Sequence, residues 1–328
     1  MYIYLMITQK CNCFCSFCIR NNLHNKADHE QSLSSLIDSM DFLSVAFPKA
    51  TLVITGGEPF LYKDWDKLVR YALGNFSSVV IPSNGTFDSK VRSKLKEFFN
   101  KNFYLQMSLD GTKNVHDEIR GKGVFDSVVQ NLTELSAYSS RIVISSTVGV
   151  HNADCICNLA SFLNDFKFRY WKVSLEQICT PGCGREINYS DWNKLVDRIL
   201  PKCAYEVHIK KQFDFELMDK MVGKEHLLKS TNRNCGFGHN KIYVDTNLDV
   251  YPCSCIDLKI GNLKENTPES LKEKINNLGN ITPSVDSPCF FCKYRKICNG
   301  GCPGYSYKFF GCLNRGDIRC PIVKGSLK

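Results

Sequence analysis

Lys10-Cys11-Asn12-Cys13-Phe14-Cys15-Ser16-Phe17-Cys18-Ile19 is the stretch that decides how this chain is interpreted. Cys11, Cys15 and Cys18 have the spacing C-x3-C-x2-C and follow a short apolar segment, Tyr2–Ile7, which is typical of a buried strand. Iron–sulfur clusters are held by cysteine thiolates, and a cubane cluster has four irons to ligate. Three cysteines leave one iron open, so the loop predicts a catalytic cluster rather than one that only carries electrons.

Two other interpretations of this loop remain open at this point. Structural zinc usually takes a pair of cysteines and a distant second pair, and Cys13 would crowd a tetrahedral site here. Disulfide frameworks belong to short secreted chains. The rest of the chain decides among the three.

Length and composition indicate a globular protein without a membrane partner. The chain has 328 residues, of which 43% are hydrophobic and 23% charged, enough for one large domain and a small one. No apolar run approaches the roughly 18 residues that span a bilayer, and the first residues read as a strand rather than a signal peptide. With 18 cysteines and no export signal, we expect a cytoplasmic protein whose reduced thiols bind metal.

The net charge of +9 does not point to nucleic acid. Lysine and arginine are scattered along the chain, no basic tract is longer than two residues, as in Lys210-Lys211, and no array of basic and aromatic residues stands out. Bound iron–sulfur clusters would also offset part of the charge. Nucleic acid is therefore an unlikely partner.

The first half of the chain alternates between strand and helix patterns. The strand-like runs are Tyr2–Ile7, Thr51–Thr55, Ser78–Pro82, Phe103–Leu109, Arg141–Val148 and Tyr170–Ile178. Helical stretches with apolar residues at three- and four-residue spacing separate them, which predicts an α/β fold with a parallel sheet covered by helices. We expect residues 1–185 to form a partial (β/α)6 barrel, with its site at the C-terminal ends of the strands.

The remainder divides into a bridging segment, residues 186–234, and a cysteine-rich segment, residues 235–328. The second holds nine cysteines, many turn formers and little periodicity, so we expect that it buries no ordinary core and needs metal to hold it together.

Polar and glycine-rich motifs follow the predicted strands. Gly56-Gly57-Glu58-Pro59 follows the second strand, where glycines permit close backbone approach to a ligand and a carboxylate can accept from an ammonium group. Ser83-Asn84 follows the third strand, and Ser108 ends the fourth. Arg120 lies twelve residues after Ser108, and its planar guanidinium suits a carboxylate. Taken alone, Arg120 would be assigned to an exposed salt bridge.

In this order, these motifs resemble the radical S-adenosylmethionine (radical SAM) enzymes. The resemblance implies that Cys11, Cys15 and Cys18 hold a 4Fe–4S cluster whose open iron chelates SAM, and that one electron splits SAM into methionine and a 5′-deoxyadenosyl radical. The SAM contacts that it implies are Gly56, Gly57, Glu58 and Pro59 for the amino group, Ser83 and Asn84 beside the ribose, Ser108 and Arg120 for the carboxylate, and Phe17 near adenine. His116 and Asp117 are interpreted as structural.

The C-terminal cysteines resemble the SPASM extension of this family, which carries two auxiliary 4Fe–4S clusters. The resemblance assigns Cys289, Cys292, Cys298 and Cys320 to the outer cluster, and Cys235, Cys253 and Cys302 to the inner one. The fourth ligand of the inner cluster is left open among Cys255, a substrate atom and no ligand. Leu248 stands where the family pattern has glycine, which puts the local turn in doubt but not the thiols. A zinc ribbon is the alternative for this segment.

Members with this extension mostly modify peptides, so the first interpretation is a maturase of a ribosomally made precursor peptide. It would install a crosslink, thioether, oxidation or epimerisation, and would use an external one-electron reductant such as flavodoxin or ferredoxin. Because the sequence starts directly at the first strand, we expect either a separate peptide-recognition protein or substrate binding by the barrel mouth and the cluster domain.

Three alternatives are kept. In sulfatase-maturing relatives an Asp taken as the base directly follows the second auxiliary cysteine, and here Ser254 occupies that position. The others are a radical SAM dehydrogenase acting on a small molecule and a zinc-binding adaptor for nucleic acid or protein. No catalytic base is assigned. Cys179 and Cys183 could donate a hydrogen atom or bind metal, although they are more simply interpreted, with Cys155, Cys157 and Cys203, as small buried hydrophobes.

Overall fold

The computed structural model describes residues 1–19, 30–177, 186–227, 237–238, 240–279 and 281–327. The predicted strands are all present and differ only at their ends. They are β1 (Tyr2–Thr8), β2 (Thr51–Gly56), β3 (Ser78–Ser83), β4 (Phe103–Ser108), β5 (Ile142–Val148) and β6 (Tyr170–Leu175). Each pairs in parallel with the next, so the sheet grows in chain order from β1 to β6.

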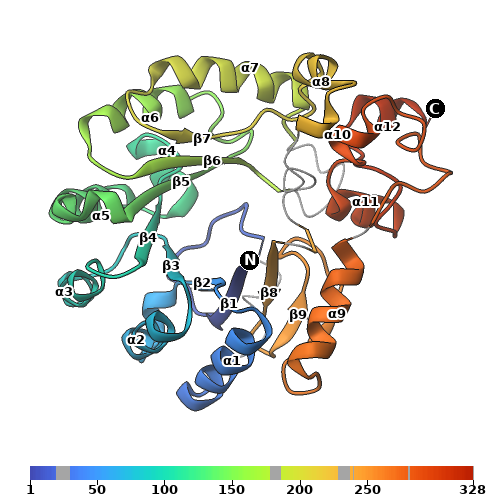
Figure 1. Ribbon diagram of the computed structural model, residues 1–328. Helices are drawn as coiled ribbons and strands as arrows, with labels where there is room; N and C mark the ends of the chain where they lie inside the picture. Colours follow the sequence, from blue (N-terminus) through green and yellow to red (C-terminus); the bar gives the residue numbers. More distant parts are fainter. Residues whose placement is uncertain (20–29, 178–185, 228–236, 239, 280, 328) are drawn as a thin grey trace.

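Helices cover the outer face of this curved sheet (Figure 1). They are α1 (Leu33–Ala46), α2 (Trp65–Asn75), α3 (Ser89–Phe98), α4 (Lys113–Arg120), α5 (Val124–Glu134), α6 (Ile156–Phe162) and α7 (Tyr189–Ile199). Alternation along β1 sets the two faces of the sheet. Ile3 and Leu5 are fully buried in the main core, whereas Tyr2 and Tyr4 line a cavity on the opposite face. The fold is therefore the predicted open α/β barrel.

The sheet continues past both ends of the six predicted strands. β7 (Val207–His208) pairs in parallel with β6, and β8 (Lys241–Val244) pairs in parallel with β1. β9 (Asp249–Tyr251) and β10 (Gly261–Asn262) follow β8 as antiparallel neighbours. Strands from distant parts of the sequence thus flank the barrel on its open side.

The expectation that residues 235–328 bury no ordinary core is wrong for the first part of that segment. Ile242, Val244 and Val250 from β8 and β9 are buried in the main core. α9 (Pro268–Gly279) packs beside α1 through Leu271 and Ile275. Pairing with the edge of β1 supplies the apolar surface that the segment lacks by itself.

The last part of the chain matches the expectation of a small, loop-rich unit. Its helices are short: α10 (Arg295–Cys298), α11 (Pro303–Phe310) and α12 (Pro321–Gly325), and they lie together beside α8 (Phe215–Met221) (Figure 1). Its buried apolar clusters are small and contain cysteines, such as Cys289 and Cys320 with Val323. In the part of the chain that the model describes, no helix has the length and apolar character needed to cross a membrane.

Candidate cluster and cofactor sites

The loop that carries Cys11, Cys15 and Cys18 begins where β1 ends and is held by backbone hydrogen bonds. Gly57 donates its N–H to the Thr8 carbonyl at 2.9 Å, and Glu58 donates to the Lys10 carbonyl at 2.7 Å. Within the loop, the N–H of Cys18 donates to the carbonyl of Cys15 at 3.0 Å. The predicted ligands therefore lie on one tight loop that is tied to the end of β2.

The thiols of this loop lie in a partly buried environment. Cys15 is buried, whereas Cys11 and Cys18 are half-buried. Burial raises the pKa of the Cys15 thiol to about 11, and the nearby Arg120 guanidinium opposes this rise. A hydrogen bond with Cys11, together with burial, raises the pKa of Cys13 above its ordinary value. Without a bound cation these groups stay protonated, whereas iron would favour the thiolates.

Gly56 and Gly57 make the close approach that the sequence suggested, but to a different partner. A Cβ at Gly57 would lie 2.2 Å from the Lys10 carbonyl oxygen, and one at Gly56 would lie 2.6 Å from that of Thr8. Such distances leave no room for a side chain. The glycines thus let β2 approach the backbone that leads into Cys11, and they help to position that loop.

Glu58 joins the ends of two strands. Its buried carboxylate accepts hydrogen bonds from the Ser83 hydroxyl at 2.9 Å, the Asn84 N–H at 2.8 Å and the Phe60 N–H at 3.4 Å. Burial outweighs these bonds and raises the pKa of Glu58 to about 7. A carboxylate has about four acceptor positions, so one is left for a ligand such as an ammonium group.

Asn84 extends this network to the cysteine loop. Its side-chain amide donates to the Asn12 side-chain oxygen at 2.7 Å, and Asn12 donates in turn to Thr86 at 2.8 Å. Pro59 opens a short helical turn next to Glu58. The motifs predicted after β2 and β3 are therefore brought together with the loop after β1.

Arg120 is not the exposed salt bridge that would be its default assignment. Its side chain is 11% exposed, and its Nε donates to Asp110 Oδ2 at 2.5 Å. Asp110 is fully buried and its second oxygen accepts the Thr147 N–H at 2.7 Å. The Arg120 guanidinium carbon lies 5.5 Å from the Phe17 ring centroid. Ser108 ends β4, next to Ser145 of β5.

Two polar residues at strand ends escaped the sequence analysis. The Phe17 ring stacks on His151 with centroids 5.2 Å apart, and His151 Nδ1 lies 3.4 Å from Glu176 Oε2. Within the described part of the chain, His151 Nε2 and Glu176 Oε2 are buried and have no hydrogen-bond partner. Glu176 directly follows β6, as the other motifs follow their strands, and this position was the signal that could have revealed it.

The structural interpretation of His116 and Asp117 is confirmed. His116 Nδ1 accepts the Asp110 N–H at 3.0 Å in a fully buried position, and burial lowers the pKa of His116 to about 4. Asp117 accepts the N–H groups of Gly123 and Phe125, which fixes the start of α5.

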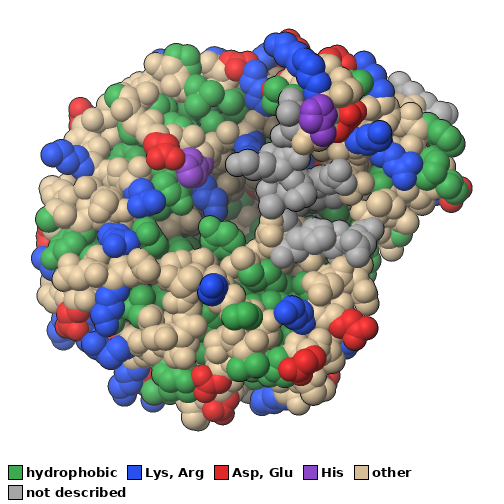
Figure 2. All heavy atoms as spheres, viewed as in Figure 1, with side chains coloured by type: hydrophobic (Ala, Val, Ile, Leu, Met, Phe, Trp, Pro, Cys, Tyr) green, Lys and Arg blue, Asp and Glu red, His purple; other side chains and the backbone are tan. Residues whose placement is uncertain are grey.

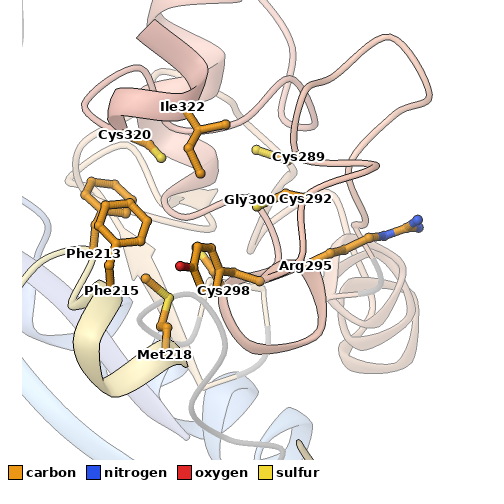
Figure 3. A pocket seen from close by; sticks show the side chains of 11 residues that line it. Phe213, Phe215, Met218, Cys289, Cys292, Arg295, Cys298, Gly300, Cys320 and Ile322 are labelled. Atoms are coloured by element: carbon orange, nitrogen blue, oxygen red, sulfur yellow. The ribbon is translucent and has the colours of Figure 1, made fainter. Parts of the chain in front are cut away.

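Four C-terminal cysteines, Cys289, Cys292, Cys298 and Cys320, line one pocket (Figure 3). They are the set that the sequence assigns to an outer cluster. Phe213, Phe215 and Met218 form the facing wall, whereas the Arg295 side chain points away from the pocket. Burial and the neighbouring Cys320 and Cys289 raise the pKa of Cys298 to about 12.

The four thiols of this pocket suit a 4Fe–4S cluster, because cysteine thiolates are the usual ligands of such clusters. Structural zinc also binds four cysteines, so the zinc ribbon stays the alternative for this segment.

Cys253, Cys255 and Cys302 line a second, larger cavity of about 860 Å³, to which Cys298 also contributes. A hydrogen bond with Cys255 and the cations Lys241 and Lys308 lower the pKa of Cys253 to about 6. Cys235, Cys179 and Cys183 lie outside the described residues. Cys157 is buried in the main core and Cys203 packs against it, as expected of small hydrophobes, whereas Ser254 is exposed.

Comparisons with known proteins match this geometry. Residues 5–163 match the Radical SAM superfamily. The chain is 26% identical to a cysteine-type anaerobic sulfatase-maturating enzyme of Clostridium novyi, over 90% of this chain and 85% of that protein. It is 28% identical to the sporulation killing factor maturation protein SkfB of Bacillus subtilis, over 80% of this chain and 62% of that protein. An AdoMet-dependent heme synthase of Oleidesulfovibrio alaskensis is 24% identical over 93% of this chain and 83% of that protein.

Solved structures share the fold over nearly the whole chain. Native anSMEcpe with bound AdoMet has a TM-score of 0.75 and 19% identity, covering 98% of this chain and 94% of that one. Streptococcus suis SuiB bound to the precursor peptide SuiA has a TM-score of 0.77 and 16% identity, covering 98% of this chain and 75% of that one. The likeness includes the C-terminal segment as well as the barrel.

Proposed function

Because residues 5–163 form a radical SAM domain, in a chain related to both peptide maturases and sulfatase-maturing enzymes, we propose that this protein is a radical SAM peptide maturase with two auxiliary clusters. It would be an oxidoreductase of the SPASM type. The observation that carries the proposal is the pocket of four cysteines, Cys289, Cys292, Cys298 and Cys320, behind this domain. An enzyme that only cleaved SAM would not need it.

The residues at the N-terminal site fit the cofactors that the proposal requires. One loop carries three thiols at cluster spacing, and cysteine thiolates are the usual ligands of a cubane. The buried His151 Nε2 has no hydrogen-bond partner among the described residues, and the His151 ring stacks on Phe17, where a polar group of a nucleoside would satisfy it. When bound, the cluster and SAM together supply one-electron chemistry strong enough to abstract a hydrogen atom from a substrate.

The protein groups would bind and orient these cofactors. Asp110 holds the guanidinium of Arg120 at its Nε, which leaves the other N–H groups available to a carboxylate of SAM. Glu58 retains an acceptor position for the SAM ammonium group, with Ser83 and Asn84 fixing its orientation. Ser108, Gly56, Gly57 and Pro59 complete the proposed contacts, and Phe17 covers the adenine side.

The C-terminal cysteines would carry electrons. In the proposal, Cys289, Cys292, Cys298 and Cys320 hold the outer cluster, and Cys235, Cys253 and Cys302 hold the inner one. Cys255 lies beside Cys253 and is the protein candidate for the fourth inner ligand. An external flavodoxin or ferredoxin would supply the initiating electron. We place the enzyme in the cytoplasm, where thiols stay reduced.

Sulfatase maturation is the second candidate, because sulfatase-maturating enzymes are among the relatives that cover most of the chain. Its expected base, an Asp directly after Cys253, is replaced here by the exposed Ser254. A hydroxyl group does not ionise near neutral pH and cannot take that role alone. The substitution favours peptide maturation.

The proposal is tested with anaerobically reconstituted protein, SAM and dithionite. We expect 5′-deoxyadenosine without substrate, and a mass change in a short peptide encoded beside this gene when it is added. Formation of 5′-deoxyadenosine without any peptide product, but with conversion of a sulfatase Cys or Ser peptide, would favour the second candidate. Absence of 5′-deoxyadenosine from iron-replete protein would overturn both.

A further inference from the structure

The large cavity beside the inner cysteines lies on the open side of the barrel, between β1 and β6. The inward faces of these strands provide Tyr4 and Lys172, and the C-terminal segment provides Cys253 and Cys302. In the space-filling view this face of the molecule is hollowed near its centre (Figure 2). The cavity therefore connects the barrel interior with the cysteines proposed for the inner cluster.

Cations dominate the lining of this cavity. Six of its lining residues are Lys or Arg and two are Asp: Lys172, Lys210, Lys211, Lys241, Lys308 and Arg319, with Asp214 and Asp317. In a concave site with protein walls, such an excess of one sign attracts ligands of the other.

Several of these cations have other roles. Asp317 holds Arg319 through two hydrogen bonds, of 2.7 and 3.0 Å, and the Arg319 guanidinium lies 3.7 Å from the Tyr305 ring centroid. Lys211 pairs with Asp197 at 2.8 Å. Lys241 and Lys308 act on Cys253 and lower its pKa, so they can balance thiolate charge.

Lys172 has no such role. It lies on β6 between Ser145 of β5 and His208 of β7, and its side chain faces the cavity. Lys172 is half-buried, and among the described residues it forms no ion pair. Burial and the neighbouring Lys241 both lower its pKa. An ammonium group partly withdrawn from water is normally paired with a counter-charge.

We infer that Lys172, with Lys241 as a second cation, anchors a carboxylate of the substrate inside the barrel cavity. That the bound molecule is the enzyme's substrate rests on the proposed function, whereas the carboxylate site itself does not. An Asp or Glu side chain of a peptide and a small polycarboxylate present the same group, which accepts from ammonium donors. Lys241 also lowers the pKa of Cys253 and can balance thiolate charge, so Lys172 is the cation chosen for the test.

The site is tested by binding to the reconstituted holoprotein, without SAM. Fluorescence anisotropy follows a fluorescein-labelled octapeptide of alternating Gly and Glu, and the matched peptide of Gly and Gln. We expect the Glu peptide to bind more tightly, and its affinity to fall as salt screens the contact.

Lys172→Gln should weaken the binding of the Glu peptide by about tenfold, the usual scale for losing a charged hydrogen bond, whereas Lys172→Arg should keep most of that affinity. Lys96→Gln, an exposed position on α3, should change nothing.

The source of the carboxylate is separated by competition with tricarballylate. Displacement of the Glu peptide by millimolar tricarballylate supports a small polycarboxylate as the natural ligand, and its failure to displace supports an acidic peptide. Equal binding of the Glu and Gln peptides, or unchanged binding to Lys172→Gln, would overturn the site. Loss of iron from Lys172→Gln would also overturn it, by giving that residue a role in cluster retention. Because SAM cleavage is measured separately, failure of the proposed function remains distinguishable from failure of the site.

Discussion

Arg120 lies between the buried carboxylate of Asp110 and the Phe17 ring of the cysteine loop. Its ion pair with Asp110 fixes one edge of the guanidinium, and a bidentate contact to a ligand carboxylate needs the other edge. We expect Arg120→Gln to raise the SAM concentration for half-maximal cleavage by about tenfold, since hydrogen bonds to charged groups contribute about 1.5–3 kcal/mol. The measurement is 5′-deoxyadenosine formation against SAM concentration.

Arg92→Gln is the matched control for this variant. Arg92 is also mostly buried, and it bonds Glu134 at 2.9 Å and Asn131 at 2.6 Å on the helical side of the barrel. Both variants lose an ion pair, so both should be less stable. An equal shift in SAM dependence for both would reduce Arg120 to a stabilising residue.

The cysteine loop contains its own control, because Cys13 lies between two proposed ligands. Cys13→Ala keeps the backbone N–H that donates to Cys11 Sγ at 3.4 Å and removes only a small buried side chain. We expect Cys15→Ala to lose about four irons per chain and all SAM cleavage, and Cys13→Ala to retain both. Iron analysis measures cluster content in both variants, and 5′-deoxyadenosine assays measure their SAM cleavage. Full iron content in Cys15→Ala would remove it from the ligand set.

His116 gives a pH-dependent prediction. Its pKa is about 4 in the folded protein and about 6.5 when unfolded, so the unfolded state binds more protons between these values. Stability from neutral His116 is complete above pH 6.5 and is lost as the pH falls, by about 2 kcal/mol between pH 7 and 5. The His116→Gln variant has no imidazole to protonate, so it should not lose this stability as the pH falls.

Urea unfolding of both proteins at several pH values tests the His116 prediction. The stability advantage of the wild type should be largest at pH 7 and shrink towards pH 5. The raised pKa of Glu58, about 7, produces the opposite slope, but it is present in both proteins and cancels in their difference. A difference that stays constant with pH would contradict the burial of a neutral imidazole.

At this scale the sequence predicted the residues that share a short motif and missed those that meet across strands. Cys11, Cys15 and Cys18 are fixed by spacing within one loop. His151 and Glu176 come together only because β5 and β6 are neighbours, and no spacing rule encodes their contact. The pairing of Arg120 with Asp110 was also not foreseen.

At the scale of elements, the end of β2 holds the cysteine loop through glycine. Since a Cβ at Gly57 would lie 2.2 Å from the Lys10 carbonyl oxygen, Gly57→Ala must displace backbone rather than a flexible side chain. We expect a loss of stability of about 2 kcal/mol or more, together with loss of iron from the first cluster. Gly74→Ala, at an exposed helical position of α2 with no atom within 4 Å of the added Cβ, should be neutral or stabilising by up to about 1 kcal/mol.

Denaturant unfolding and iron content separate the two glycine variants. Retention of both properties in Gly57→Ala would show that the loop can move without harm, and would contradict the close packing between β2 and residues 8–10.

The six principal strands were predictable because each is either an apolar run or an alternation of apolar and polar residues. β7 and β10 were not, since each has two residues and no pattern of its own. Tertiary pairing with β6 and β9 alone defines them. Their positions depend on contacts that local sequence does not encode.

At the scale of the molecule, the C-terminal segment both completes the sheet and carries the cysteines. Tyr2 of β1 pairs with Lys241 of β8, a contact between residues far apart in the sequence. This segment was expected to be a separate unit because the composition changes where it begins. Composition does not show which edge strand of the sheet is free to pair with it. The consequence is a connection through the sheet between the two proposed cluster sites: β8 lies beside β1, and the antiparallel β9 runs back along β8 towards Cys253, at the other end of these strands from the cysteine loop.

We predict that the N-terminal cysteine loop and the C-terminal cysteines perform separable steps of the reaction. Cys292 lines the four-cysteine pocket, whereas Cys312 follows α11 and lies outside that pocket. We expect Cys292→Ala to lose the outer cluster, about four irons, while the N-terminal loop still cleaves SAM, so that 5′-deoxyadenosine forms without peptide product.

Cys312→Ala is the matched control. It should retain iron, SAM cleavage and peptide product, because its thiol is in neither proposed ligand set. Mass spectrometry of the peptide beside 5′-deoxyadenosine quantification measures both steps at once. Full product formation by Cys292→Ala would take the outer cluster out of the reaction, and loss of iron from Cys312→Ala would require a different ligand set.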